Sequence, residues 1–360
     1  MPCNMTLLQR FSRHAGLLAL SALCLVSSAC GHKVAAPKAD SSAEPDKVLF
    51  ESSMDSINKG KLEVGRLGLQ TLMNTYPDSE YLAKAKLGIA DSYFKEGGMT
   101  GMTHAVAEYE DFITFFPFLE EASYAQMQVG MAHYRRMEKP DRDHTEALAA
   151  ENAFQILLQK YPDGPIAEEG RQRLREVQEI LAEGEMRTAS YYFIRKADRS
   201  ALGRLQRLVT RYPLYSQADQ ALWNIGTIYE RHGGGSEIST QYYARIVKDY
   251  PLSPLAPDAK AKLQKFSVAI PDPDPAALDR MKKEAAMTRV GPGLLGRSLG
   301  GLKTGPNVST AARTGEPTMT PSTLEADTAA IANLPGLPAP TGGAGNTTDI
   351  TVQTVTPTRK

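Results

Sequence analysis

Aromatic residues are missing from the C-terminal part of this 360-residue sequence: none follows Phe266, although the chain has 10 Phe, 15 Tyr and 1 Trp. Because aromatic side chains bury large areas and dominate protein cores, we expect the folded core to precede position 267. Net charge is missing as well, since 41 Lys and Arg residues balance 41 Asp and Glu residues. Without a basic field the chain has nothing to attract nucleic acid, so we predict no nucleic-acid partner.

The residue patterns of an active site or a metal centre are also lacking. No two of the six histidines have the i, i+4 spacing of a zinc-binding helix, and neither a nucleophile elbow nor a phosphate-binding glycine loop occurs. His133 occupies a packing position of a helical repeat, and we expect His144, in a charged loop, to be solvated. The run 141–143 (Asp-Arg-Asp) favours a loop salt bridge over a metal site. We therefore predict a protein that is not an enzyme and uses neither a metal nor a cofactor.

Cysteine is scarce, and its positions indicate export. Arg10 and Arg13 precede an apolar run at residues 16–26, which is too short to span ~30 Å of hydrocarbon and is typical of a signal peptide. The run ends in Ser27-Ser28-Ala29-Cys30. These small residues resemble a lipobox, in which a diacylglyceryl group joins the thiol before the chain is cut ahead of it. Ser27 stands where that motif usually has Leu.

Acylation would explain the single cysteine of the mature chain. Cys3 and Cys24 would leave with the signal peptide at residues 1–29, although Cys24, which follows Leu23, is itself a competing acylation site. Two or three acyl chains, with ~0.8 kcal/mol for each buried CH₂, make a durable anchor. We predict a lipid on Cys30 and a flexible tether over residues 30–45. An ordinary signal peptide cut nearby is the alternative.

A repeated unit occupies residues 46–266. Five aromatic–proline dipeptides punctuate it, and their prolines stand at positions 77, 117, 162, 213 and 251. Twelve residues before each proline stands a small residue, and eight and five residues before it stand large, mostly apolar ones. Steps of four and three place these positions on one helical face, and proline ends the helix. With the small residue and the ring three positions later in the preceding helix, this is the tetratricopeptide pattern, whose usual unit is ~34 residues.

The sequence thus predicts an all-α fold, a tetratricopeptide superhelix of about five helical hairpins. The widest proline spacing contains an extra helical stretch at residues 166–182, which predicts one long helix or two nearly continuous ones. Residues 267–360 are rich in Gly, Pro, Thr and Ala and bury too little to offset ~1–2 kcal/mol of ordering entropy per residue. We predict a mostly disordered tail, wholly so after residue 290, with a short helix at residues 276–288.

Stacked hairpins present a concave surface lined by their first helices. The positions one, four and five residues after the small residue of a first helix should face inward. In the second and third units these are Asp91, Phe94, Lys95, Met131, Tyr134 and Arg135. A groove of rings and charges suits an extended peptide. The alternative is that some of these side chains only cover a solvent-facing surface.

Several of these features together resemble the BamD family, the lipoprotein of the outer-membrane barrel assembly machine. They are the run 89–95 (Ile-Ala-Asp-Ser-Tyr-Phe-Lys), the loop 140–145 (Pro-Asp-Arg-Asp-His-Thr), the closing segment 154–162, the long helix, the five repeats and the cysteine. The resemblance covers residues 43–266. The Pro/Thr/Gly-rich tail after Met287 departs from the compact family form.

The resemblance implies a lipid-anchored protein on the periplasmic face of the outer membrane. Its expected partners are the POTRA domains of BamA, other lipoproteins of the BAM complex, and the C-terminal signals of unfolded barrel precursors. Tyr76 and Pro77 match the end of the first repeat near the substrate pocket, and Arg204 matches a basic position tied to BamA. Another periplasmic tetratricopeptide lipoprotein, a scaffold for cell-wall synthesis or the Tol system, would share the anchor and repeats and remains the alternative.

Overall fold

The computed structural model describes residues 44–232, 235–287 and 305–320. All regular secondary structure in these ranges is α-helical, which confirms the all-α prediction. Cys30, the signal peptide and most of the tether lie outside the described residues.

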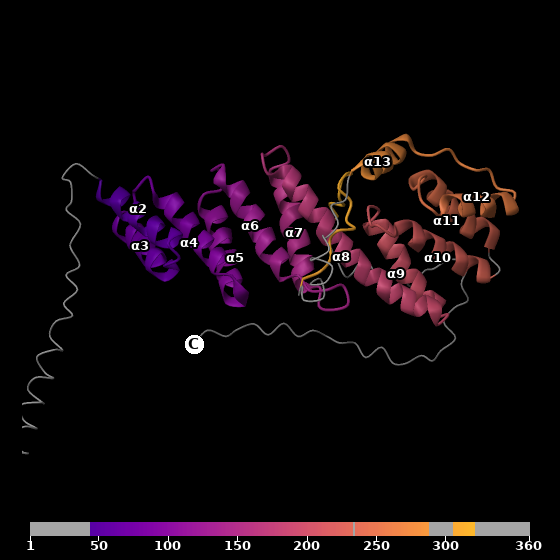
Figure 1. Cartoon of the computed structure of the whole chain (residues 1–360), viewed down its shortest axis with the longest axis horizontal. Coiled ribbons are helices and arrows are strands. Elements are labelled where there is room, and N and C mark those ends of the chain that lie inside the picture. Colours follow the sequence, from indigo (N-terminus) through magenta and orange to yellow (C-terminus); the bar gives the residue numbers. More distant parts are fainter. Residues whose placement is uncertain (1–43, 233–234, 288–304, 321–360) are drawn as a thin grey trace, which may run out of the picture. The chain divides into compact units, whose positions relative to one another are not determined.

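The helices follow one another as hairpins, and from α3 to α12 each described helix packs against the next (Figure 1). Their bounds are α2 (Pro45–Asn58), α3 (Leu62–Thr75), α4 (Leu82–Glu96), α5 (Gly98–Phe115), α6 (Glu121–Arg136), α7 (Thr145–Lys160), α8 (Ala167–Ile194), α9 (Asp198–Arg211), α10 (Ala218–Arg231), α11 (Gly235–Asp249), α12 (Ala256–Lys265) and α13 (Pro275–Ala286).

The aromatic–proline dipeptides end the second helix of each hairpin. The aromatic residue is the last to donate a helical hydrogen bond, as when the Tyr76 amide donates to the Leu72 carbonyl over 2.8 Å. The following proline has no N–H and cannot extend the helix. The same bond recurs at Phe116, Tyr161, Tyr212 and Tyr250.

The residues at two fixed distances before each proline are buried. The large residues eight positions before are fully buried, and those five positions before are no more than 1% exposed. They are Leu69, Tyr109, Phe154, Leu205 and Tyr243, and Leu72, Phe112, Leu157, Leu208 and Ile246. These two positions form the core inside each hairpin, as the sequence pattern predicts.

Glycines in the first helices allow these rings to approach. A Cβ added to Gly226 would lie 2.7 Å from the ring of Tyr243, and one added to Gly130 would overlap the ring of Phe154. The small residue of one helix therefore receives the large residue of its partner.

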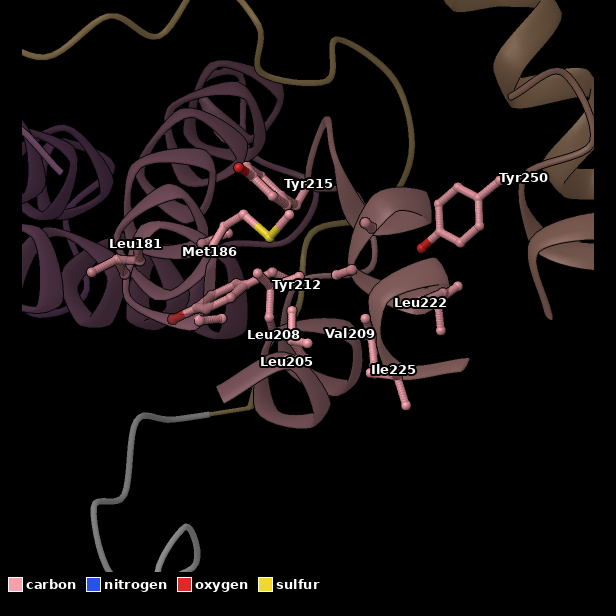
Figure 2. Close-up of a cluster of buried hydrophobic side chains, with 14 of the residues drawn as sticks. Leu181, Met186, Leu205, Leu208, Val209, Tyr212, Tyr215, Leu222, Ile225 and Tyr250 are labelled. Atoms are coloured by element: carbon pink, nitrogen blue, oxygen red, sulfur yellow. The ribbon is translucent and has the colours of Figure 1, made fainter. Parts of the chain in front are cut away.

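The long helix expected between the third and fourth units is a single 28-residue helix, α8. It packs against α7 and against α9. Leu181 and Met186 of α8 meet the α9 side chains Leu205 and Leu208 and the adjoining Tyr212 in one buried cluster (Figure 2). Because α8 belongs to both neighbours, the third and fourth units share a continuous core.

The helix that the sequence places at residues 276–288 spans Pro275–Ala286. Asp274 precedes it, and its carboxylate accepts a hydrogen bond from the Ala276 amide over 3.1 Å. Proline at the first helical position suits this start. The Asp274 amide donates to the Lys248 carbonyl of α11 over 3.0 Å, which attaches α13 to the last hairpin.

Residues 305–320, called here the tail segment, lie against α8 (Figure 1). Ala311 is 3% exposed and Ala312 is 9% exposed. The prediction that the chain lacks ordered structure after residue 290 is therefore corrected for this segment. The prediction rested on the scarcity of large apolar residues. The segment is held by hydrogen bonds from side chains of α7 and α8 to its main-chain carbonyls, and these bonds need no large apolar side chains.

Candidate protein-binding surface

Three of the six residues that the sequence predicts to line the groove lie close together on α4 and α6. Asp91 and Phe94 of α4 and Arg135 of α6 surround Tyr109 of α5 and Tyr124 of α6; these five residues are called here the aromatic–arginine cluster. The Tyr109 and Tyr124 hydroxyls both donate to one Asp91 carboxylate oxygen, over 2.6 and 3.1 Å. The Arg135 guanidinium lies 4.0 Å above the centre of the Phe94 ring.

Burial shapes the electrostatics of this cluster. Removal of water raises the pKa of Asp91, although the hydrogen bonds from the two tyrosines oppose this shift. Burial and the neighbouring Asp91 charge raise the pKa of Tyr124 to about 12. The tyrosines therefore remain protonated donors at neutral pH and fix the carboxylate between them. Asp91 is engaged inside the cluster, whereas Arg135 is exposed.

Tyr134 and Met131 face a different part of the stack. The Tyr134 hydroxyl donates to Glu176 of α8 over 2.7 Å, and the Arg173 guanidinium, which also pairs with Glu176 at 3.0 Å, lies 5.5 Å from the ring centre. Met131 packs against the large core cluster. Both residues thus connect α6 to the following helices, and Tyr134 holds α6 against α8.

Lys95 reaches backward rather than into a groove. Its amine donates to the Ile57 carbonyl at the end of α2 over 2.9 Å, where a cation suits the negative end of the helix dipole. Tyr76 is half-buried and Pro77 is exposed at the end of α3. The structure gives neither of them a contact with the aromatic–arginine cluster among the described interactions.

Arg204 of α9 pairs with Glu185 of α8. One guanidinium nitrogen, Nη1, lies 3.1 Å from both carboxylate oxygens and donates to them. Its side chain keeps 39% exposure, so an incoming acidic group could share it. Arg207 approaches the same carboxylate at 3.4 Å.

Several residues of this surface escaped the sequence analysis. Tyr109 appeared there only as a packing residue, yet its hydroxyl serves Asp91. Tyr124, Arg173 and Glu176 were not selected, because nothing in a single repeat indicates which residue of the next helix its polar groups meet. The sequence did offer one indication of this contact: the two helices that follow the predicted inward-facing Asp91 each contain a tyrosine that can donate to a carboxylate.

The loop before α7 differs from its prediction. His144 is not freely solvated: its Nε2 donates a hydrogen bond to the Pro140 carbonyl over 3.0 Å, and its ring packs over Gly184 of α8, where a Cβ would overlap it. Asp143 forms no loop salt bridge among the described ion pairs; its carboxylate accepts hydrogen bonds from the Thr145 amide and hydroxyl over 3.1 and 2.9 Å. These two bonds lower the pKa of Asp143 and mark the start of α7.

Comparison with known proteins identifies the family. The profile of the YfiO family, described as "Outer membrane lipoprotein", matches residues 42–243, more than half of the chain. The chain belongs to the YfiO family of outer membrane lipoproteins.

This chain is also similar to proteins named outer membrane protein assembly factor BamD. The Vibrio cholerae protein is 26% identical over 223 residues, which cover 59% of this chain and 88% of that relative. The Xylella fastidiosa protein (strain 9a5c) is 26% identical over 259 residues, 68% of this chain and 85% of the relative. The Rickettsia prowazekii protein is 20% identical over 241 residues, 65% of this chain and 92% of the relative. The resemblance to the BamD family noted in the sequence is thereby confirmed.

The YfiO match extends from just before α2 into α11. It includes the aromatic–arginine cluster and the Arg204–Glu185 pair. It leaves out α12, α13 and the tail segment.

Among residues 44–232, 235–287 and 305–320, no helix has the length and apolar character needed to cross a membrane. Within the same ranges, no group of three or more His, Cys, Asp and Glu residues is arranged to hold a metal ion.

Proposed function

We propose that this protein is a lipid-anchored adaptor of outer-membrane β-barrel assembly. It is attached through Cys30 to the periplasmic face of the outer membrane. It docks on the POTRA domains of BamA beside other lipoproteins of the BAM complex. It binds C-terminal signals of unfolded barrel precursors and acts by binding rather than by catalysis.

The family match over the repeats supports this proposal most. It covers residues 42–243, and the relatives are named outer membrane protein assembly factors. Stacked hairpins supply a long surface for protein partners, which is the physical requirement of an adaptor.

Co-purification tests the partners. The full chain, tagged at its C-terminus and extracted from native membranes in mild detergent, should bring down a large barrel protein bearing POTRA domains, identified by mass spectrometry. Recovery of peptidoglycan enzymes or Tol proteins in its place would sink the proposal and support the scaffold alternative.

The anchor is tested by two matched cysteine variants. Cys30→Ser should abolish palmitate labelling of the chain and release it from the outer-membrane fraction. Cys24→Ser, the control, should leave both unchanged. Labelling that depends on Cys24 would place the anchor there.

The exposed guanidinium of Arg135 is the group of the aromatic–arginine cluster best suited to receive a peptide carboxylate. Its position above Phe94 places a ring beside the charge, so that one peptide end can contact both. Arg135→Glu should weaken binding of a barrel C-terminal peptide by at least tenfold in fluorescence anisotropy. Tyr134→Phe is a useful control, since it removes only the hydroxyl bound to Glu176. Unchanged affinity in Arg135→Glu would exclude this residue from the binding site.

The Arg204–Glu185 pair is the proposed contact with BamA. Arg204→Glu should reduce capture of BamA while leaving precursor peptides bound, because its pair lies on α8 and α9 and the aromatic–arginine cluster lies on α4, α5 and α6. Arg187→Glu is the matched control, since Arg187 pairs with Glu183 on the same helix at 55% exposure. Equal loss in both variants would mean only a general effect of charge.

A further inference from the structure

The tail segment is held by a row of donors on two helices. Gln155 lies on α7, and Gln172, Arg175 and Gln178 lie three residues apart along one side of α8; these four residues are called here the carbonyl groove. Gln172, Arg175 and Gln178 donate to the carbonyls of Ala312, Gly315 and Thr318 over 3.4, 2.8 and 2.7 Å. Gln155 donates to the carbonyls of Thr318 and Thr320 over 3.1 and 3.3 Å.

Gln178 pairs with both main-chain polar groups of one tail residue, Thr318. Its amide nitrogen donates to the Thr318 carbonyl, and its amide oxygen accepts from the Thr318 amide over 3.1 Å. The carboxylate of Glu151, which can only accept, takes a second bond from the Gln178 nitrogen at 3.2 Å and so fixes the orientation of the amide. Arg211 in turn pairs with Glu151 at 3.1 Å. This buried network orients the Gln178 amide toward the tail segment.

The tail segment covers these donors closely. Gln155, Arg175 and Gln178 are 2, 5 and 5% exposed although each is polar. If the segment leaves, each donor can turn to water. The carbonyl groove can therefore exist in an open state in which water hydrates its side chains. Another segment can then replace the tail segment without disrupting the hairpin core.

The carbonyl groove contacts the main chain of the tail segment, and the space around Gly315 admits only a small residue. Every hydrogen bond named above between these four residues and the tail segment goes to or from the tail main chain. The side-chain pair of Arg171 with Glu316, at 3.5 Å, leaves Glu316 85% exposed. A surface pair of this kind contributes little. Size matters more: a Cβ on Gly315, whose φ is +95°, would lie 2.9 Å from Arg280 and 3.0 Å from Leu214.

The path of the chain favours binding of the tail segment to the carbonyl groove of its own molecule. Glu284 of α13 accepts hydrogen bonds from the Arg313 amide and from the Thr314 amide and hydroxyl, at 2.6, 2.6 and 2.9 Å. Because α13 is attached to α11, the tail segment is delivered to the groove by its own chain. A tether of this kind supplies an effective concentration on the order of 1 mM, enough to fill a site of modest affinity.

We propose that the carbonyl groove is a second peptide-binding site, which the tail segment fills in cis as a displaceable plug. Its ligand in trans is a non-helical segment of a partner polypeptide with the chemistry of the plug: accessible carbonyls, small side chains and a glycine at the bend. This site is separate from the aromatic–arginine cluster and does not depend on a role in barrel assembly.

The probe that tests the plug is a fluorescent synthetic peptide of residues 305–320, added to the full mature chain. Gly315→Val in the protein should release the plug, because valine fits neither the positive φ nor the space beside Leu214. We expect this variant to bind the probe at least tenfold more tightly than the unchanged protein. Adding Gln178→Ala should cancel that gain, and a probe that itself carries Gly315→Val should not bind. Far-UV circular dichroism should stay unchanged, since residue 315 lies outside the hairpins.

Equal affinity of the unchanged protein and the Gly315→Val variant would overturn the proposal, as would a gain that survives Gln178→Ala. A doubling of mass of the unchanged protein in light scattering, reversed by Gly315→Val, would assign the groove to the tail of a second copy and overturn the partner assignment. Neither measurement uses BamA or a barrel precursor. Failure of the proposal about the carbonyl groove is therefore distinguishable from failure of the proposed function.

Discussion

The repeat hairpins and the tail segment are both ordered, but different contacts hold them. In a hairpin, side chains such as Phe154 and Tyr243 are fully buried against small residues of the partner helix. In the tail segment, the carbonyls of Gly315 and Thr318 accept hydrogen bonds from side chains of α7 and α8. The apolar contacts are cooperative with the whole stack, whereas the hydrogen bonds exchange readily with water. We infer that the hairpins set global stability and that the tail segment opens by itself.

The largest expected effect comes from emptying a hairpin core. Phe154→Ala should lower the free energy of unfolding by about 3–5 kcal/mol, because the ring is fully buried and leaves a cavity. Urea denaturation followed by circular dichroism measures it. Phe118→Ala is the control, since Phe118 is 100% exposed and its loss should cost less than about 0.5 kcal/mol. Similar losses in both variants would contradict the proposed core.

A second effect should be confined to the tail segment. Gly315→Val should abolish the protection from hydrogen exchange of the Arg313, Thr314 and Thr318 amides, which donate to Glu284 and Gln178. Amides in the hairpins should keep their protection, with global stability changed by less than about 1 kcal/mol. Glu316→Gln, at the exposed end of the Arg171 pair, should leave all of them protected. A parallel loss of hairpin protection would show that the two regions unfold together.

A smaller effect should separate the two ends of the tail segment. Glu284→Ala removes the acceptor for the Arg313 and Thr314 amides, and hydrogen bonds to a charged group contribute about 1.5–3 kcal/mol. These two amides should exchange faster, while the Thr318 amide, held by Gln178, stays protected. Glu284→Gln, which keeps one acceptor oxygen, should show most of the original protection. Equal acceleration at all three amides would mean that the segment leaves as one unit.

The smallest effect is a pH dependence within the hairpins. Burial raises the pKa of Asp91 above its usual 3.8, so the folded chain binds this proton more tightly than the unfolded chain. The resulting stability is fully present below pH 3.8 and is lost as the pH rises through the raised pKa. Asp91→Asn should remove this dependence, so the unchanged protein should lose stability relative to the variant as the pH rises. A difference that is constant with pH would show that Asp91 titrates normally.

Much of the hairpin architecture was contained in the spacing of residues around five prolines. The positions twelve, eight and five before each proline needed only helical geometry to place them on one face, and burial at Leu69 through Tyr243 agrees with this. The aromatic–arginine cluster was half predicted: Asp91, Phe94 and Arg135 were selected by position within a repeat. Their partners Tyr109 and Tyr124 were not, because the register between neighbouring helices depends on how side chains interlock.

The sequence by itself determined the all-α repeats, an extra helical stretch between the third and fourth units, and the family, because these depend on local periodicity and on residue types at fixed spacings. Tertiary structure alone decided that residues 305–320 are ordered. Their composition is too poor in large apolar groups to form a core, and their ordering depends on donors such as Arg175 and Gln178, about 140 positions earlier in the chain. A bond between a side chain and a distant main-chain carbonyl leaves no pattern in sequence, since every residue has a carbonyl.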